Sequence, residues 1–287
     1  MSYQQVNTIS FIKRHRLIYM IIGGLILILL TINKAMGEAD GLMIQSIYLE
    51  PETEFHFVMG TDSLYMDQGR NQLDDGGIVW GHAQWQLGSI NAHSSIGRGT
   101  HQDYTEWNSG MELKLLTTAE FEATVGVQFT GIFGRERESD IELSTSLSYE
   151  GRDWFTSSID HTYSLDTHGH FVELSLQGKS LVFQNGATLT PYVTQAFDFE
   201  FVVDDYNGLN HFQMGIQAAF PLNQRITIFG HLSHITPQKG IKHEASSQSG
   251  HKASTYARVN HTAIDASATD VTSKQIFAGV YFSWYFP

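Results

Sequence analysis

Histidines and acids are the residues of this chain whose chemistry could carry a function: 14 histidines and 30 aspartates and glutamates among 287 residues. His231 and His234 form the best candidate for a metal-binding histidine cluster. On a strand they would point to opposite faces, so they cannot easily bind one ion. His243, His251 and His261 are spaced eight and ten residues apart, which matches no compact zinc site. The sequence therefore predicts no metal site and no cofactor.

His231 and Ser233 share one face of their segment, an arrangement in which a histidine can activate a serine toward an ester. Some outer-membrane lipid hydrolases carry His, Ser and Asn in this way, and the segment is similar to theirs, with His234 in place of the asparagine. The group that would orient the histidine is missing from the segment, and alternation turns His231 away from lipid. We therefore expect no enzyme, and lipid or ester hydrolysis is the less favoured alternative.

Composition limits the class of protein. The net charge of -13 argues against nucleic acid as a partner, because nucleic-acid binding needs a basic surface. Charged residues are 16% of the chain and aromatic residues 12%, with no cysteine for disulfides or thiolate metal sites. No stretch after residue 33 approaches the roughly 20 apolar residues of a membrane helix. The mature chain is therefore either soluble or a membrane barrel with alternating faces.

Alternation of apolar and polar residues is the main structural signal after residue 40. Between residues 121 and 130, Phe, Ala, Val, Val and Phe alternate with Glu, Thr, Gly, Gln and Thr. Segments of about ten residues with this period are typical of membrane-barrel strands. We predict twelve: 53–65, 77–87, 89–97, 104–116, 119–133, 139–150, 152–165, 169–178, 186–198, 209–220, 224–236 and 275–286. The predicted fold class is all-β, a transmembrane antiparallel up-and-down barrel of about twelve strands, because closure favours an even number.

Short and long connections alternate between these segments. The short ones are residues 88, 117–118, 151, 221–223 and, as the loosest fit, 179–185, and the longer, more polar ones include 66–76, 98–103, 134–138, 199–208 and 237–274. Residues 166–168 are an exception, because this connection is short although it should face outward. Outer-membrane barrels have short periplasmic turns and longer outer loops. The pattern predicts periplasmic termini and a long outer loop at 237–274.

The same alternation divides the side chains between lipid and lumen. A lysine or arginine on the lipid face at mid-depth costs about 2–4 kcal/mol, so charged and polar side chains should face inward. The predicted pore-lining residues are His82, Glu112, Lys114, Glu122, Gln128, Glu142, Asp160, Glu173, His211 and His231. Acids outnumber bases in this set, which favours cations or cationic solutes. Aromatic residues near strand ends are predicted to form interfacial girdles: Tyr65, Trp85, Trp107, Trp154, Phe155, Tyr192, Trp284 and Phe286.

Both ends of the chain carry signals of export and membrane assembly. A basic stretch at 13–16, an uncharged apolar run at 17–32 and small residues at Gly37 and Ala39 predict a signal peptide at 1–39, cleaved or kept as an anchor. A periplasmic segment at 40–52 and the barrel at 53–287 follow. In the last strand, Val280, Phe282, Trp284 and Phe286 should face lipid and close the barrel against residues 53–65. The terminal aromatic residue resembles the signal that the barrel-assembly machinery recognises, although Pro287 follows it.

Two stretches resemble a known family. They are residues 59–70 (MGTDSLYMDQGR) and residues 206–216 (YNGLNHFQMGI), the latter followed by PLNQRITI at 221–228. With the strand layout over 53–286, they make the chain similar to the TorF-like porins, which are Gram-negative outer-membrane barrels. MDQG at 66–69 replaces the aromatic-Arg-Gly element of that family. The resemblance implies a barrel in the cell outer membrane with a channel role.

The expected function is a non-enzymatic porin or narrow channel for small solutes. Its expected partners are those solutes, outer-membrane lipid, lipopolysaccharide and the barrel-assembly machinery, and Arg135 and Arg137 offer contacts to lipopolysaccharide phosphates. The alternative is a secreted or periplasmic β-sandwich that acts as a binding module. A sandwich would show the same alternation but would bury its apolar faces against each other.

Overall fold

The computed structural model describes residues 53–73, 76–134, 137–152, 154–242 and 274–286. The predicted signal peptide, the segment 40–52 and residues 243–273 of the predicted long loop lie outside these ranges. The strands of the described part are β1 (Thr53–Asp62), β2 (Met66–Asp67), β3 (Arg70–Asn71), β4 (Ile78–Leu87), β5 (Ile90–Gly99), β6 (Tyr104–Thr117), β7 (Phe121–Gly134), β8 (Glu138–Arg152), β9 (Phe155–Ser164), β10 (His170–Gly178), β11 (Leu181–Val182), β12 (Thr188–Phe199), β13 (Asn207–Pro221), β14 (Ile226–Pro237) and β15 (Gln275–Phe286).

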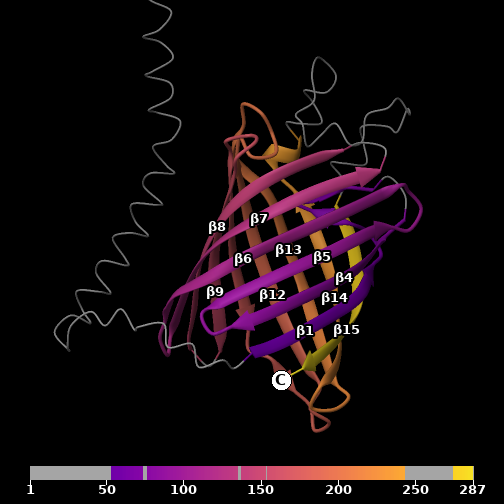
Figure 1. Cartoon of the computed structure of the whole chain (residues 1–287), viewed down its shortest axis with the longest axis vertical. Coiled ribbons are helices and arrows are strands. Elements are labelled where there is room, and N and C mark those ends of the chain that lie inside the picture. Colours follow the sequence, from indigo (N-terminus) through magenta and orange to yellow (C-terminus); the bar gives the residue numbers. More distant parts are fainter. Residues whose placement is uncertain (1–52, 74–75, 135–136, 153, 243–273, 287) are drawn as a thin grey trace, which may run out of the picture. The chain divides into compact units, whose positions relative to one another are not determined.

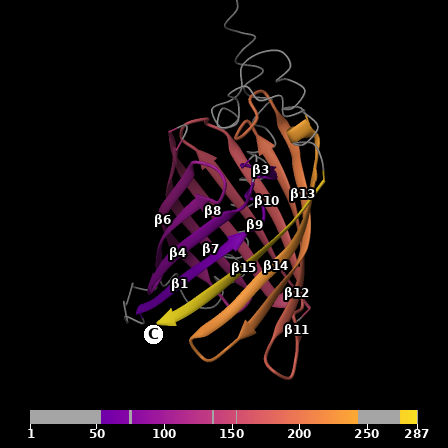
Figure 2. The same ribbon diagram turned by 90° about the vertical axis from the view of Figure 1, so that its right-hand side faces the viewer.

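Twelve long strands form one closed antiparallel barrel (Figures 1 and 2). Strands adjacent in sequence pair with each other, β10 pairs with β12, and β15 pairs with β1 to close the sheet. The predicted all-β class and its twelve strands are confirmed, with boundaries shifted by a few residues. The sandwich alternative is wrong, because the sheet closes on itself. No helix within the described ranges is long and apolar enough to cross a membrane.

The last strand shows why the sequence forms a barrel wall. Ile276, Val280 and Phe282 are 67%, 52% and 41% exposed on the outer face. In β1, Met59 pairs with Phe282, and the rings of Phe55 and Phe286 lie 5.8 Å apart between centroids. Period-two alternation places all of these side chains outside. The outer face at the seam between the first and last strands is thus mostly apolar.

The first connection differs from the prediction. Strand β1 ends at Asp62 rather than at residue 65, and the predicted outer loop 66–76 turns into the barrel as the β2–β3 hairpin. Gln68 and Gly69 have φ angles of 46° and 82°, which suit a two-residue hairpin turn. Tyr65 and Leu73 on either side are 8% and 1% exposed. The prediction of Tyr65 as a girdle residue is therefore wrong.

Tyr192 is a second girdle residue that points inward. Its ring lies over Gly215, where a Cβ atom would overlap it. Its hydroxyl lies 2.6 Å from Ser233 Oγ, two strands away. The girdle prediction for Tyr192 is wrong because a glycine on the neighbouring strand makes room for the ring inside the barrel.

Candidate functional site: a lumen narrowed by an inward hairpin

The predicted lining residues alternate along their strands with exposed apolar side chains, such as Leu143 beside Glu142 and Leu174 beside Glu173. Among the charged ones, Lys114 Nζ lies 3.1 Å from Glu122 Oε2, so this pair adds no net charge. Asn91 donates a hydrogen bond of 3.0 Å to Glu112. Four other predicted residues have polar or ring partners: His82 stacks on His93, Gln128 Oε1 lies 3.1 Å from His93 Nε2, Asp160 accepts from Ser146 and Ser158, and His211 Nδ1 lies 2.9 Å from Asn210 Oδ1. Glu173 lies opposite Asp160 on the neighbouring strand.

Glu106 fixes the hairpin to the barrel wall. The hydroxyls of Tyr65 and Tyr104 each donate to its Oε2 at 2.5 Å, and Asn108 Nδ2 donates to its Oε1 at 2.7 Å. Glu106 is only 6% exposed. A buried carboxylate is costly unless its oxygens are paired, and here three donors pair them. One of these donors comes from the inward segment, so the carboxylate ties that segment to β6.

Asp67 is the acidic residue of the hairpin itself. Gln72 donates to its Oδ2 at 3.3 Å. Burial inside the barrel, followed by the nearby charge of Glu106, raises the pKa of Asp67 from 3.8 to about 7, and the guanidinium of Arg70 partly opposes this shift. The hairpin therefore carries a carboxyl group that changes charge near neutral pH.

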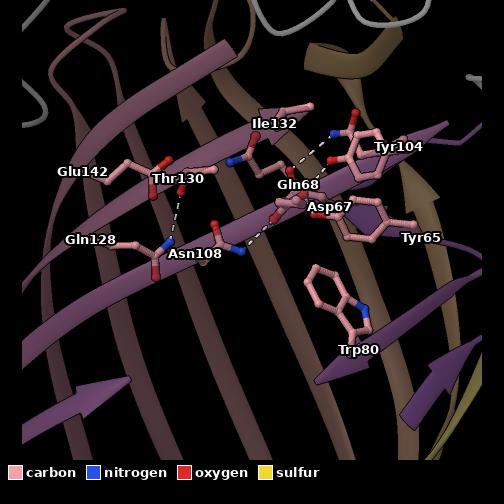
Figure 3. A pocket seen from close by; sticks show the side chains of 12 residues that line it. Tyr65, Asp67, Gln68, Trp80, Tyr104, Asn108, Gln128, Thr130, Ile132 and Glu142 are labelled. Atoms are coloured by element: carbon pink, nitrogen blue, oxygen red, sulfur yellow. Dashed lines mark hydrogen bonds between the residues drawn. The ribbon is translucent and has the colours of Figure 1, made fainter. Parts of the chain in front are cut away.

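The hairpin leaves a polar cavity on each side. The first, of about 250 Å³, lies between the hairpin and strands β4, β6, β7 and β8 (Figure 3). The second, of about 300 Å³, lies between the hairpin and strands β8, β9, β10, β13 and β14. Asp67, Gln68 and Glu142 line both cavities. The hairpin tip thus divides the lumen into two polar passages that share these residues.

A second segment also folds inward, after β12. The Asp198 carboxylate accepts hydrogen bonds from the backbone N–H groups of Phe201, Val202 and Val203 at 2.8, 3.2 and 3.1 Å. All three residues are at most 4% exposed, and Phe201 packs on Phe171 with ring centroids 5.7 Å apart. The prediction of residues 199–208 as a polar outer loop is therefore wrong for this part. Phe201 borders the second cavity.

A chain of hydrogen bonds crosses the seam between the first and last strands. His231 Nε2 lies 2.9 Å from Asp62 Oδ1, and His231 Nδ1 lies 2.9 Å from Ser233 Oγ. Ser233 Oγ also contacts the Tyr192 hydroxyl, and Tyr281 donates to Asp62. Asp62 is thus the orienting group that the sequence alone did not reveal, and the expectation that it is missing is wrong.

This arrangement has the connectivity of a Ser-His-acid relay. Ser233 is only 1% exposed, however, and its oxygen already has two partners. A substrate carbonyl has no access to that oxygen in this arrangement. The hydrogen-bond chain therefore links β1, β12, β14 and β15 rather than presenting a nucleophile.

Some residues of the site could have been found by alternation, and others could not. Glu106 lies on the same face of its strand as Glu112 and Lys114, so the period alone places it inside. Asp67 and Tyr65 lie in a connection with no such period. Within the described residues no group of three or more metal-ligating side chains is placed to hold a metal ion.

Comparisons with known proteins find only distant likenesses. No family model matches the chain, and no curated protein matches its sequence. Among solved structures, the chain is similar to the KdgM porin, with 4% identity, a TM-score of 0.48, and coverage of 82% of this chain and 99% of that one. It is similar to the COG4313 outer membrane channel from Pseudomonas putida F1, with 9% identity, a TM-score of 0.46, and coverage of 82% and 95%. It is also similar to LpxR from Salmonella typhimurium, with 6% identity, a TM-score of 0.47, and coverage of 80% and 100%. Likenesses this distant assign no function.

Proposed function

We propose that this protein is a channel of the bacterial outer membrane, narrowed by its inward hairpin and selective for small cationic solutes. The observation that carries the proposal is the pair of polar cavities, about 250 and 300 Å³, inside a closed barrel. The outer face of the barrel is apolar, with Ile276 and Val280 more than half exposed. A closed antiparallel barrel satisfies every strand hydrogen bond internally and so suits a bilayer.

The preference for cations follows from the charges around the hairpin. Asp67, Glu106, Glu142 and Glu173 line the two cavities, and Arg70 on the hairpin offsets part of their charge. Acidic side chains around a constriction favour cations. The proposed lining set remains His82, Glu112, Lys114, Glu122, Gln128, Glu142, Asp160, Glu173, His211 and His231.

Purified protein in planar bilayers is expected to conduct with a reversal potential that indicates cation preference in a KCl gradient. Glu173→Gln removes one acidic group at the second cavity and should lower the cation-to-anion permeability ratio by about twofold. The matched control is Glu54→Gln, because Glu54 lies on β1, far along the strand from the hairpin connection. The control should keep the ratio of the unmodified protein.

Three results would count against the channel. Absence of conductance from correctly folded protein would reject it. Anion preference would reject the acidic lumen. Equal effects of Glu173→Gln and Glu54→Gln would show that selectivity depends on the overall charge rather than on the constriction.

Selectivity should change with pH around the pKa of Asp67, about 7. The charged form of Asp67 is disfavoured inside the barrel. Docking of the hairpin is therefore most favourable at a pH below the ordinary aspartate pKa of 3.8, and it weakens as the pH rises through 7. Raising pH from about 5.5 to about 8.5 also adds negative charge to the constriction and should increase cation preference, with more current fluctuation as docking weakens. Reversal potentials measured across this pH range test the expected increase in cation preference. Asp67→Asn should reduce the response without abolishing it, because the acids Glu142 and Glu173 line the same cavities. An unchanged titration in that variant would assign the response to those acids.

Ester hydrolysis remains the second candidate, because Ser233, His231 and Asp62 are connected as in a relay. The burial of Ser233 argues against it. Turnover of a 4-nitrophenyl ester by the purified protein that is lost in Ser233→Ala would establish hydrolysis. Equal background rates in both proteins would exclude it for this class of substrate.

Other parts of the proposal concern export and assembly. The signal peptide at 1–39 would direct export, and the aromatic end of β15 at Phe286 would engage the barrel-assembly machinery. Arg137 would contact lipopolysaccharide phosphates beside Arg135, which lies outside the described residues. Membership of the TorF-like porins remains a prediction, since no family model matches.

A further inference from the structure

The side chains that line the first cavity favour one class of solute over others. Three carboxyl groups line it, those of Asp67, Glu106 and Glu142. Figure 3 shows Glu142 on the wall that faces the hairpin residues Asp67 and Gln68. An anionic solute would be repelled from this space, and a cation would be attracted.

Four hydrogen-bond donor groups of the cavity are used within the protein. The hydroxyls of Tyr65 and Tyr104 and the amide of Asn108 all donate to Glu106. Likewise, the Gln72 amide donates to Asp67. These four donor groups are therefore not available to a solute in the cavity.

Some hydrogen-bond acceptors of the cavity, in contrast, have no partner within the protein. Gln68 Oε1 and Asn108 Oδ1 are buried and have no hydrogen-bond partner among the described residues. In the same part of the chain, no donor lies within hydrogen-bond distance of the Glu142 carboxylate. Buried polar atoms normally have a partner. An alkylammonium group carries three donors and no acceptor, so it complements this cavity better than a neutral hydroxyl compound, which also brings acceptors.

Aromatic rings form another side of the cavity. Trp80 and Tyr104 flank Tyr65, with ring centroids 5.4 and 5.8 Å from it. Such rings attract cations through their faces and cover hydrocarbon chains. A hydrated inorganic cation would gain little from them, whereas an alkylammonium ion would gain contacts for both its charge and its carbon chain.

We infer that the cavity between the hairpin and strands β4, β6, β7 and β8 binds a small organic cation with a primary ammonium group. This inference rests on the proposed function, since it names the class of solute that the constriction takes. About 250 Å³ corresponds to the liquid volume of roughly eight water molecules, enough for a short alkylamine.

Calorimetric titration of the full chain in detergent tests the site without requiring conduction. The probes are n-butylammonium, butan-1-ol and potassium ion at equal ionic strength. We expect n-butylammonium to bind, and butan-1-ol and potassium ion to bind at least about tenfold more weakly, because only the first has both charge and an apolar chain. Glu142→Gln should weaken n-butylammonium binding by about tenfold, because it removes an acidic acceptor without breaking a hydrogen bond of the wall.

The matched control is Glu54→Gln, which removes an acid of β1 that lies outside the cavity. Both variants should show the folded form on unheated gels. Equal binding of n-butylammonium and butan-1-ol, displacement by an equal concentration of potassium ion, equal loss in the two variants, or no binding of n-butylammonium would each overturn the inference. Conductance without binding would reject the site alone, whereas binding without conductance would reject the channel alone.

Discussion

Replacing residues 64–76 with a short Gly-Ser turn is expected to raise single-channel conductance by at least about twofold, because cavities of about 250 and 300 Å³ would merge into one passage. The barrel should tolerate the change. Asp62 and Ile78 pair directly at the ends of β1 and β4, so a short turn can join them. Glu106 would keep its bonds from Tyr104 and Asn108.

Conductance in planar bilayers measures the effect, and folding is checked by heat-modifiable migration on gels. A matched control shortens the connection at residues 183–186, where Phe183 is 54% exposed and its N–H donates to the Ala187 carbonyl in a tight turn. That variant should conduct like the unmodified protein. Equal conductance in all three proteins would mean that the hairpin does not limit the passage.

The twelve strands could be predicted because alternation is a local property. Each side chain in Phe121–Gly134 is placed inside or outside by its position alone, so the period assigns both the strand and its faces. The same logic puts Glu142 and Glu173 inside without knowledge of their partners. The predicted strand boundaries differ from the observed ones where the chain leaves the sheet for a reason unrelated to the period. The end of β1 at Asp62 is an example.

The inward hairpin could not be predicted in this way. Polar residues at 66–72 satisfy the usual description of a solvent-exposed loop equally well. What brings them inside is a set of distant contacts, such as the bond from Tyr65 to Glu106, 41 residues later. The contact between Asp62 and His231 spans 169 residues. Such pairs depend on which strands become neighbours when the barrel closes, which no single segment encodes.

The contact between Asp62 and His231 depends on a glycine. Gly279 pairs in register with both residues, so it lies between them on the inner face. A Cβ atom at Gly279 would overlap Asp62 Oδ1, His231 Nε2 and the Tyr281 ring. The missing side chain therefore allows a hydrogen-bonded link across β15, at the seam where the sheet becomes a barrel.

Gly279→Leu is accordingly expected to destabilise the closed barrel by about 3–5 kcal/mol, through overpacking and through loss of the hydrogen bonds around Asp62. Urea titration in liposomes, read by the folded band on unheated gels, measures this loss. The matched control is Ala278→Leu, one residue earlier, where the side chain is exposed on the outer face. It should change stability by no more than about 0.5 kcal/mol.

Equal destabilisation by both substitutions would show that β15 is sensitive to a larger side chain on either face. The loss of stability would then not depend on the hydrogen bond between Asp62 and His231. A tolerated Gly279→Leu would show that Asp62 and His231 can separate without opening the seam. The expected difference between the two variants follows from geometry alone. Adjacent residues of one strand face opposite sides of the wall, and only the inner one stands between a carboxylate and an imidazole from two other strands.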